Sequence, residues 1–449
     1  MDLKSLSDQF IEFEKTHDAL QWQIEGINAW RLIRFDIFQA LVSERNLFEF
    51  AHPQLKSRKN NIKKHFENIK TSVLKNNFRK LKKNNFLFLP HNRNINGKDI
   101  YSHELMSYIG FENLNNIYPA TPPTPYSNAI ILGWPALKIA MNNIAMNRFK
   151  YIPYKKHHND IQNFSNKFRT FFKSQIKIEK IIFRELYRFQ TYEAAYTKIL
   201  KCLTPKAVIL VTHYSHLAMI NAAQKLQIPT YEIQHGTIST NHMGYYFPHD
   251  DNPPYMPDTL LCHGEHWTRK PPLPLSLNTQ IIGATHVSKL INIKSNKIEN
   301  QVLIFSQGTV ATDLFAFAIE SANLAKNHKI IYRLHPSELR NAYPTSGFPS
   351  NFEIRTDAST FFDDLTQSEF IATVYSTTIY EAMACGAKGI VIGLNGHNAV
   401  QDIIDNGDAQ LANTPEDFIK ALKKSKPCKH PEKYYAAVNY DALNFTKLE

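Results

Sequence analysis

Five histidines in this sequence stand at the ends of short apolar runs that read as β-strands. They are His91, His213, His235, His263 and His335, at the ends of the runs 85–90, 207–213, 229–235, 258–263 and 329–335. A neutral imidazole can accept a proton or donate to a phosphate near pH 7. Because ligands of open parallel sheets bind beyond the carboxyl ends of the strands, these histidines predict a site for proton transfer or phosphate binding at such an edge.

The glycines are placed in the same way. The chain has only 15 glycines, and four come directly after predicted strands: Gly236, Gly264, Gly283 and Gly308. Glycine lets a chain turn sharply or lets a ligand approach the backbone, so these positions mark the same edge. A metal site is not expected, because the His-x-x-His pair of His213 and His216 comes without the third ligand that zinc needs.

The elements that would position these residues follow an α/β pattern. From residue 84 onward, strand-like runs alternate with helical stretches, which is typical of a parallel sheet. A polar stretch at 286–300 precedes a second series of the same kind, so we expect two Rossmann-like domains that face a cleft. Residues 5–50 have apolar side chains mostly three or four apart and predict helices. Further strands are expected at 129–132, 279–284, 301–306, 352–355, 369–374 and 388–393.

Positive charge is concentrated ahead of the predicted sheets. Lys and Arg number 52 against 40 Asp and Glu, and residues 55–83 hold eleven basic residues against the single acid Glu67. This basic amphipathic segment fits either a solvated face or a contact with an anionic membrane surface. Nucleic acid is not expected as a partner, because no recognised binding motif accompanies the charge. We divide the chain into a helical basic N-terminal extension (1–83), two Rossmann-like domains (84–290 and 291–430) and a C-terminal tail (431–449).

Several common chemistries lack their sequence signature. There is no P-loop, no G-x-G-x-x-G, no G-x-S-x-G elbow and no D-x-D clamp for a metal-bound diphosphate. No apolar run approaches the ~18 residues of a membrane span, and the polar first residues show no signal peptide. The four cysteines contain no C-x-x-C pair, which predicts a reducing, cytoplasmic compartment.

Three short motifs occur in order along the two series. They are Glu232-Ile-Gln-His235-Gly236-Thr237, Tyr332-Arg333-Leu-His335-Pro336 and Tyr375-Ser376-Thr377-Thr378-Ile-Tyr-Glu381-Ala. Over roughly residues 205–400 this order resembles the GT-B glycosyltransferases of bacterial surface polysaccharide synthesis, including sialyltransferase-like groups with His-Pro and Ser motifs. It is also similar to the pattern of CDP-glycerol glycerophosphotransferases. The resemblance implies a GT-B fold, with an acceptor domain at 84–290 and a nucleotide-donor domain at 291–430.

The resemblance also implies a donor-binding set. His335 would contact the donor's phosphate with Arg333 nearby, and Glu381 would hold a ribose hydroxyl. Residues 376–378 would offer hydroxyl and N–H groups at a helix N-terminus, where the dipole favours an anion, and the loop 306–309 would do the same. The alternatives are ordinary helix capping for 376–378 and a solvated helix position for Glu381. The full set is Ser306, Gly308, Thr309, Arg333, His335, Ser376, Thr377, Thr378 and Glu381.

His235 matches the general base of the glycerophosphotransferase pattern, and Glu232 on the same strand could orient or replace it. Two departures leave the identity of the base open. Gln234 stands where the pattern has an aromatic residue, and the acidic motif of the sialyltransferases is absent. The long segment after His235 suits a loop that lines the acceptor cleft, with a plain surface loop as the alternative. The acceptor or cleft residues we expect are His213, Gly236, His242 and Tyr245.

With this resemblance, the sequence predicts a glycosyltransferase of bacterial capsule or lipopolysaccharide synthesis. It would move a sugar from a nucleotide-sugar donor to a saccharide or lipid-linked acceptor, without a metal or other cofactor. The alternatives are a CDP-polyol phosphotransferase of the teichoic-acid type and a non-catalytic protein that binds polysaccharide or lipid. A UDP-sugar 2-epimerase is disfavoured, because its His-Arg-x-Glu-Asn and Ser-Gly-Gly elements are missing. We expect a cytoplasmic protein, held at the inner face of the plasma membrane if residues 55–83 bind lipid.

Overall fold

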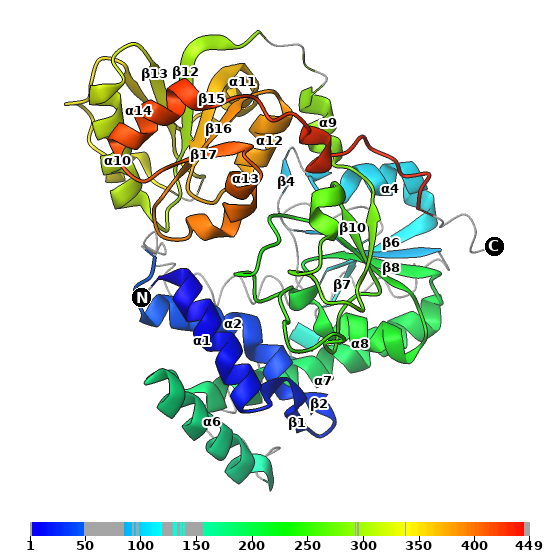
Figure 1. Cartoon of the computed structure of the whole chain (residues 1–449). Helices are drawn as coiled ribbons and strands as arrows, with labels where there is room; N and C mark the ends of the chain where they lie inside the picture. The colour runs from blue at the N-terminus through cyan, green and yellow to red at the C-terminus, as the bar shows by residue number, and fades with distance from the viewer. Residues whose placement is uncertain are drawn as a thin grey trace.

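Two parallel sheets, each with its own helices, form two α/β domains in the computed structural model of the protein (Figure 1). The structure describes residues 2–48, 85–91, 94–95, 98–118, 129–132, 135–136, 138–139, 156–291, 293, 296–336 and 338–443. The basic segment 55–83 lies outside these ranges, so its helix and its contact with lipid stay predictions. Within these ranges, no helix combines the length and the apolar character that crossing a membrane requires.

The N-terminal sheet has seven parallel strands in the order β11-β10-β9-β8-β3-β6-β7. Its strands are β3 (Phe86–Leu89), β6 (Leu114–Tyr118), β7 (Ala129–Ile131), β8 (Ala207–Val211), β9 (Thr230–Ile233), β10 (Thr259–Cys262) and β11 (Asn278–Ile281). The apolar run of β8 is buried at every position, as expected where both faces of a parallel sheet are covered. The chain order reverses between β3 and β8, and ligand crevices of open α/β sheets lie at such a reversal.

The C-terminal sheet has six parallel strands in the order β14-β13-β12-β15-β16-β17, with its reversal between β12 and β15. Its strands are β12 (Ile298–Phe305), β13 (Lys329–Arg333), β14 (Phe352–Arg355), β15 (Ser368–Thr373), β16 (Lys388–Ile392) and β17 (Ala409–Ala412). Helices α10 (Ala311–Leu324) and α14 (Pro415–Lys424) share one apolar core with this sheet. Helices α11 (Phe361–Gln367) and α12 (Thr378–Ala384) pack with the other face. The predicted α/β fold with two Rossmann-like domains is confirmed.

The first 48 residues join the N-terminal domain through a helical layer. Helices α1 (Leu3–Thr16) and α2 (Ala29–Glu44), predicted for residues 5–50, pack with α6 (His158–Phe172) and α7 (Ile178–Leu203) (Figure 1). Phe10, Phe13 and Trp30 are buried in their shared core. Inside it, the Arg34 guanidinium donates from Nε and Nη2 to the two oxygens of Glu14, at 2.6 and 2.8 Å.

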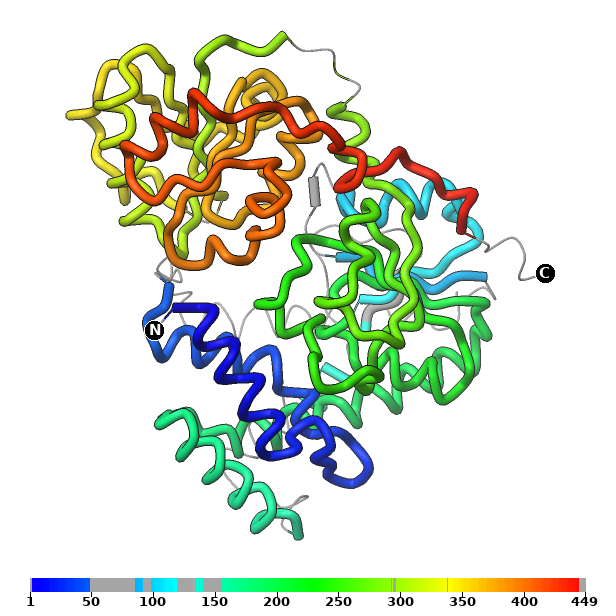
Figure 2. The backbone as a smooth tube through the Cα atoms, viewed as in Figure 1, coloured from blue at the N-terminus to red at the C-terminus, as the bar shows by residue number. Residues whose placement is uncertain are grey.

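The C-terminal residues return over the N-terminal domain, as the red end of the tube in Figure 2 shows. The N–H of Ala436 donates to the carbonyl of His263 at 2.9 Å. A Cβ at Gly264 would collide with the carbonyl oxygen of Lys433, and one at Gly283 would lie 2.7 Å from that of Ala436. The close approach that these two glycines permit is therefore made by the chain's own tail.

Candidate functional site

Four of the strand-end histidines lie together at the carboxyl edge of the N-terminal sheet. His91, His213, His235 and His263 follow β3, β8, β9 and β10, which are consecutive neighbours in that sheet. The ring of Tyr101 lies between two of them, with its centroid 5.4 Å from that of His91 and 6.3 Å from that of His235. The structure therefore brings these side chains to the reversal point, where a ligand crevice is expected.

Glu232 is the buried centre of this cluster. Its Oε1 accepts from the backbone N–H of His213 at 2.9 Å and from the Tyr245 hydroxyl at 2.7 Å, and its Oε2 lies 2.7 Å from Nδ1 of His213. Burial alone would raise the pKa of Glu232, but the charge and hydrogen bonds of His213 lower it to about 2. Glu232 is thus an ionised carboxylate, out of reach of a ligand, that positions its neighbours. Nε2 of His213 is buried without a hydrogen-bond partner.

His235 is half-buried, and two tyrosine hydroxyls contact its ring nitrogens. Nε2 lies 3.1 Å from the Tyr214 hydroxyl, and Nδ1 lies 3.5 Å from the Tyr245 hydroxyl. Since the Tyr245 proton is donated to Glu232, the Tyr245 oxygen is left to accept from Nδ1. This arrangement favours the tautomer with the proton on Nδ1 and the basic lone pair on Nε2. In this arrangement the lone pair of Nε2 faces the Tyr214 hydroxyl and is able to accept a proton.

His242 packs beside this chain and stays neutral. Its ring centroid lies 4.8 Å from that of Tyr245 and 5.4 Å from that of Tyr214. Its Nδ1 accepts from the N–H of Gly244 at 3.1 Å. Burial, followed by the charge of His235, lowers the pKa of His242 to about 3. Tyr245 and His213 are fully buried. These two predicted acceptor residues therefore pack beneath the surface of the site and do not line it.

The first and third motifs meet between the two domains. A Cβ added at Gly236 would lie 3.8 Å from Cγ2 of Thr377, at the start of α12. Beside this contact, Nε2 of His286 in α9 (Thr285–Ile291) lies 3.8 Å from Oε1 of Glu381. The hydroxyl of Thr237 is buried and has no hydrogen-bond partner. The candidate base and the candidate donor motif are therefore neighbours in space.

Hydrogen bonds join the two predicted donor loops across the reversal point of the C-terminal sheet. Oε1 of Gln307, after β12, accepts from the backbone N–H groups of Val374 and Tyr375 at 3.1 and 2.9 Å. The hydroxyls of Thr309 and Tyr375 are also hydrogen-bonded. The loop that contains Gly308 is thus fixed beside residues 376–378.

Residues 376–378 are partly exposed and organised as a helix start. Oγ of Ser376 accepts from the Thr378 hydroxyl at 2.8 Å and from the Thr378 N–H at 3.3 Å. These bonds come from Ser376, the residue before the N-cap, whereas the side chain of the N-cap residue Thr377 makes no capping hydrogen bond. Glu381 follows on α12 and faces His286 of the other domain, so it lies at the domain interface.

Arg333 and Ser306 are bound by groups of their own domain. The Arg333 guanidinium is buried, with Nε and Nη2 on Oδ2 of Asp364 at 3.0 and 2.7 Å and Nη1 on the Asp357 carbonyl. Oγ of Ser306 donates to Glu338 at 2.8 Å and is buried. Both side chains form hydrogen bonds inside the domain, and their predicted place near the donor phosphate stays a prediction.

His335 stands apart from the other histidines. It is exposed beyond the end of β13, and its N–H donates to Oε2 of Glu338 at 2.8 Å. The same carboxylate accepts from Ser306 and from the Tyr343 hydroxyl, so Glu338 fixes the His-Pro turn. The contact of His335 with a donor phosphate stays a prediction.

Sequence reasoning missed four residues that complete the site: Tyr214, His286, Gln307 and Glu338. Tyr214 directly follows a strand-end histidine, and Gln307 lies inside a loop already singled out, so position alone could have indicated these two. His286 and Glu338 gave no such signal. Across the described ranges, no group of three His, Cys, Asp or Glu side chains is arranged to hold a metal ion. Metal independence stays a prediction.

The chain was compared with known proteins by sequence and by structure. No family model matches the sequence, and no curated protein matches it. One similar solved structure is the UDP-GlcNAc 2-epimerase from Methanocaldococcus jannaschii, with 12% identity, a TM-score of 0.44, and coverage of 81% of this chain and 99% of that one. Another is the calicheamicin glycosyltransferase CalG4, with 11% identity, a TM-score of 0.45, and coverage of 82% and 94%. A third is MurG from Acinetobacter baumannii, with 14% identity, a TM-score of 0.37, and coverage of 54% and 71%.

Proposed function

We propose that the protein is a glycosyltransferase that moves a sugar from a nucleotide-sugar donor to a saccharide or lipid-linked acceptor. The observation that carries the proposal is the contact between the first and third motifs, where a Cβ at Gly236 would lie 3.8 Å from Thr377. This contact supports the proposal, because it brings the candidate base of one sheet next to the candidate anion-binding loop of the other. Transfer of a glycosyl group from a phosphate needs both of these functions in one place.

In the proposed reaction, Nε2 of His235 takes the proton of the acceptor hydroxyl as that oxygen attacks the anomeric carbon of the donor. The bond from this carbon to the phosphate oxygen breaks, and the negative charge leaves on the phosphate. Backbone N–H groups of Ser376 and Thr377 and of the loop at Gly308 would stabilise that charge. The Tyr214 hydroxyl, 3.1 Å from Nε2, either yields its place to the acceptor hydroxyl or passes the proton on. No metal is required in this scheme.

The biological setting belongs to the same proposal. The motif pattern supports a role in bacterial capsule or lipopolysaccharide synthesis, with a cytoplasmic location. Residues 55–83, with eleven basic residues, would hold the enzyme at an anionic membrane surface where lipid-linked acceptors are found.

A CDP-polyol phosphotransferase is the second candidate, and the pair of His-Gly-Thr and His-Pro elements favours it. The same base would deprotonate a hydroxyl that attacks phosphorus instead of carbon. The leaving group would then be CMP, and the phosphate would remain with the product.

Three measurements test the proposal. Calorimetry with CMP, CDP, UDP, GDP and TDP identifies the nucleotide, and donor hydrolysis is then followed with the matching nucleotide sugars and with CDP-glycerol. Release of free sugar supports the glycosyltransferase, while release of CMP from CDP-glycerol alone supports the phosphotransferase. Inertness toward every nucleotide sugar refutes the first proposal. Undiminished turnover after treatment with EDTA is expected for a metal-independent reaction, and full inactivation contradicts it.

Variants of two histidines separate catalysis from binding. His235→Ala should retain nucleotide affinity and lose turnover by about 100-fold or more, because proton transfer by a positioned base contributes that much. His430→Ala is the control, since His430 is exposed near the C-terminus and belongs to none of the three motifs. An unchanged rate in His235→Ala assigns the base to another residue.

A further inference from the structure

Basic side chains gather where helix α6 turns into helix α7. Residues 167–184, which we call the α6–α7 corner, hold six basic residues and the single acid Glu179. The basic residues are Lys167, Arg169, Lys173, Lys177, Lys180 and Arg184. Glu179 lies 3.5 Å from Arg169, whereas the four lysines are exposed and form no ion pair with any described residue. The corner is therefore a surface with a strong excess of positive charge.

The basic residues of α7 share one face of that helix. Lys177, Lys180, Arg184 and Arg188 follow one another at three or four residues, and all four are exposed. Residues at this spacing are neighbours on a helix, and like charges there repel each other. Lys177 and Lys180 also stand at the N-terminal end of α7, where the helix dipole disfavours cations. Helix stability therefore does not account for this arrangement, and an external anion would.

Apolar side chains lie among these charges. Phe171, Ile176 and Ile181 pack against the core of the helical layer and remain partly exposed. Exposed apolar groups beside lysines suit the boundary of a lipid bilayer, where lysine stems lie along the apolar region and their ammonium groups reach the head groups. A soluble polyanion would make use of the charges alone.

The chain enters its most basic segment beside this corner. The Arg45 guanidinium, at the end of α2, donates to the carbonyl of Phe172, and the N–H of Gln175 donates to Oε1 of Glu44 at 2.7 Å. The described range ends three residues after Arg45, and residues 55–83 with their eleven basic side chains follow. The two most basic parts of the N-terminal half therefore start from the same end of the helical layer.

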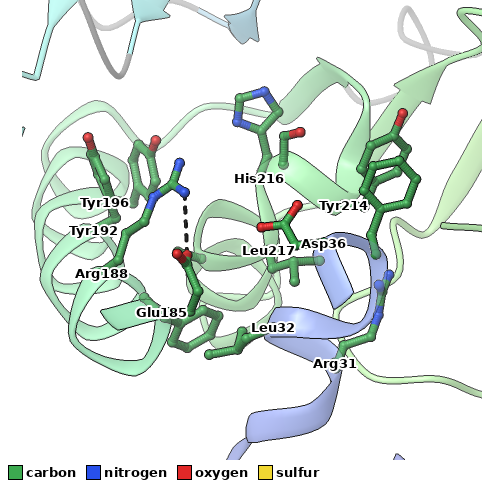
Figure 3. A pocket seen from close by; sticks show the side chains of 14 residues that line it. Arg31, Leu32, Asp36, Glu185, Arg188, Tyr192, Tyr196, Tyr214, His216 and Leu217 are labelled. Carbon is green, nitrogen blue, oxygen red and sulfur yellow. Dashed lines mark hydrogen bonds and ion pairs between the residues drawn. The ribbon is translucent and has the colours of Figure 1, made fainter. Parts of the chain in front are cut away.

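Helix α7 leads from the corner toward the catalytic cluster. Arg188 lies eight residues after Lys180, about 12 Å along the helix. Together with Tyr214 it lines a cavity of about 170 Å³ (Figure 3). The hydroxyl of Tyr214 lies 3.1 Å from Nε2 of His235. The corner is therefore close enough to this cavity for a lipid-linked saccharide to span the two.

We propose that the α6–α7 corner docks the protein on an anionic lipid bilayer, with Lys173, Lys177 and Lys180 over the phosphate head groups and Ile176 at the apolar boundary. The inference extends the membrane contact proposed for residues 55–83 to a defined surface of the structure. It rests on the proposed function only for the lipid-linked acceptor, and it can be tested without donor or acceptor.

The test is sedimentation of the full-length protein with vesicles of phosphatidylcholine and with vesicles that also contain phosphatidylglycerol. Binding should require phosphatidylglycerol and should weaken as salt is raised, because salt screens exposed charges. Equal binding to both kinds of vesicle, or to neither, overturns the proposal. Alginate, a soluble anionic polysaccharide, is the competitor. Tighter binding of alginate than of the anionic vesicles makes the corner a polysaccharide site and refutes the bilayer.

Charge reversal tests whether the corner makes the contact. The triple variant Lys173→Glu, Lys177→Glu, Lys180→Glu should bind anionic vesicles at least tenfold more weakly, because each basic residue near such a surface contributes about fivefold. Glutamate at the N-terminal end of α7 favours the helix, so we expect this variant to fold, which thermal unfolding checks. Unchanged binding assigns the contact to residues 55–83 alone and refutes the corner.

A second triple variant is the matched control. Lys423→Glu, Lys424→Glu, Lys426→Glu makes the same change of charge at three exposed lysines of the C-terminal domain, at the end of α14 and just after it. Binding to anionic vesicles should change little in this variant. Equal losses in the two triple variants show a response to net charge and refute the assignment to the corner.

The outcome separates this inference from the proposed function. Vesicle binding that depends on the corner, in a protein inert toward every nucleotide sugar, refutes the glycosyltransferase and keeps the docking surface. Sugar transfer to a soluble acceptor, by a protein with no affinity for anionic vesicles, supports the glycosyltransferase and refutes the docking surface.

Discussion

Replacing Glu232 with glutamine tests whether one buried carboxylate holds the candidate site together. The Glu232 carboxylate is fully buried and accepts three hydrogen bonds, two from His213 and one from Tyr245. Although burial alone would raise its pKa, His213 lowers it from 4.5 to about 2. At ~1.4 kcal/mol per pKa unit, the difference corresponds to roughly 3 kcal/mol of stability at neutral pH. We therefore expect Glu232→Gln, which keeps the volume and loses the charge, to lower the free energy of unfolding by about 3 kcal/mol.

The stabilisation by Glu232 should depend on pH in a direction that follows from its lowered pKa. The stabilisation is complete above pH 4.5 and is lost as the pH falls toward about 2, because the unfolded chain takes up the proton first. Urea titrations at about pH 7, 5 and 3.5 should show a gap between wild type and variant that narrows as the pH falls.

Glu353→Gln is the control for this measurement. Glu353 on β14 binds Arg355 at 2.7 Å and Lys329 at 3.2 Å, but its side chain is 43% exposed. Exposed ion pairs contribute about 0–1 kcal/mol, so this variant should lose little stability. The reasoning fails if Glu232→Gln costs no more than Glu353→Gln, or if the gap stays constant with pH.

Three further predictions concern the folded state. Burial lowers the pKa of His216 to about 4 and of His242 to about 3, so the free energy of unfolding should fall by about 2 kcal/mol per histidine between pH 6.5 and about 5. Thermal unfolding of His216→Gln and His242→Gln should be less sensitive to pH in that window, and equal sensitivity in all three proteins contradicts this. Asp364→Asn leaves the Arg333 guanidinium buried without its counter-ion and should cost about 3–5 kcal/mol in urea titration. The control variant Asp363→Asn changes an exposed neighbour and should cost little stability. If Asp364→Asn instead lowers nucleotide affinity without lowering stability, Arg333 belongs to the donor site as the motif implies. Gly264→Ala would place a Cβ against the backbone of Lys433 and release the C-terminal tail, which limited proteolysis detects. Gly347→Ala carries backbone strain without a clash and should leave the tail protected.

The edge of the sheet that carries the site could be predicted from the sequence. The run that ends on His213 contains the continuous apolar segment Ala207–Val211, which is typical of an interior strand of a parallel sheet, and the runs that end on His235 and His263 are shorter apolar segments mixed with polar residues. Once they are strands, their carboxyl ends share one edge. Two strands of the large sheets were not predicted, because they lack this pattern. β6 contains two buried asparagines, Asn115 and Asn116, and β17 has the mixed sequence Ala-Gln-Leu-Ala.

The roles of individual side chains could not be predicted in the same way, because a role depends on partners distant in the chain. Arg333 was placed near a donor phosphate by its motif, but its counter-ion, Asp364, comes from α11. Tyr245 was expected in an acceptor loop, but its hydroxyl is drawn inward by Glu232. Spacing along a sequence does not reveal such pairs. Each charged or hydroxyl side chain, taken alone, could equally well be exposed to solvent.

The proposed reaction depends on contacts outside the three motifs, because its base and its anion-binding loops come from different domains. His235 belongs to the N-terminal sheet and residues 376–378 to the C-terminal sheet, so their separation is set by whatever holds the two domains together. One such contact joins Nε2 of His266, after β10, to Oδ2 of Asp402 on α13 (Gln401–Asp405) at 2.5 Å. Another is the contact of His286 with Glu381. The distance between the base and the leaving phosphate therefore depends on the interface between the two domains. A change at that interface could disrupt the site even when all three motifs are unchanged.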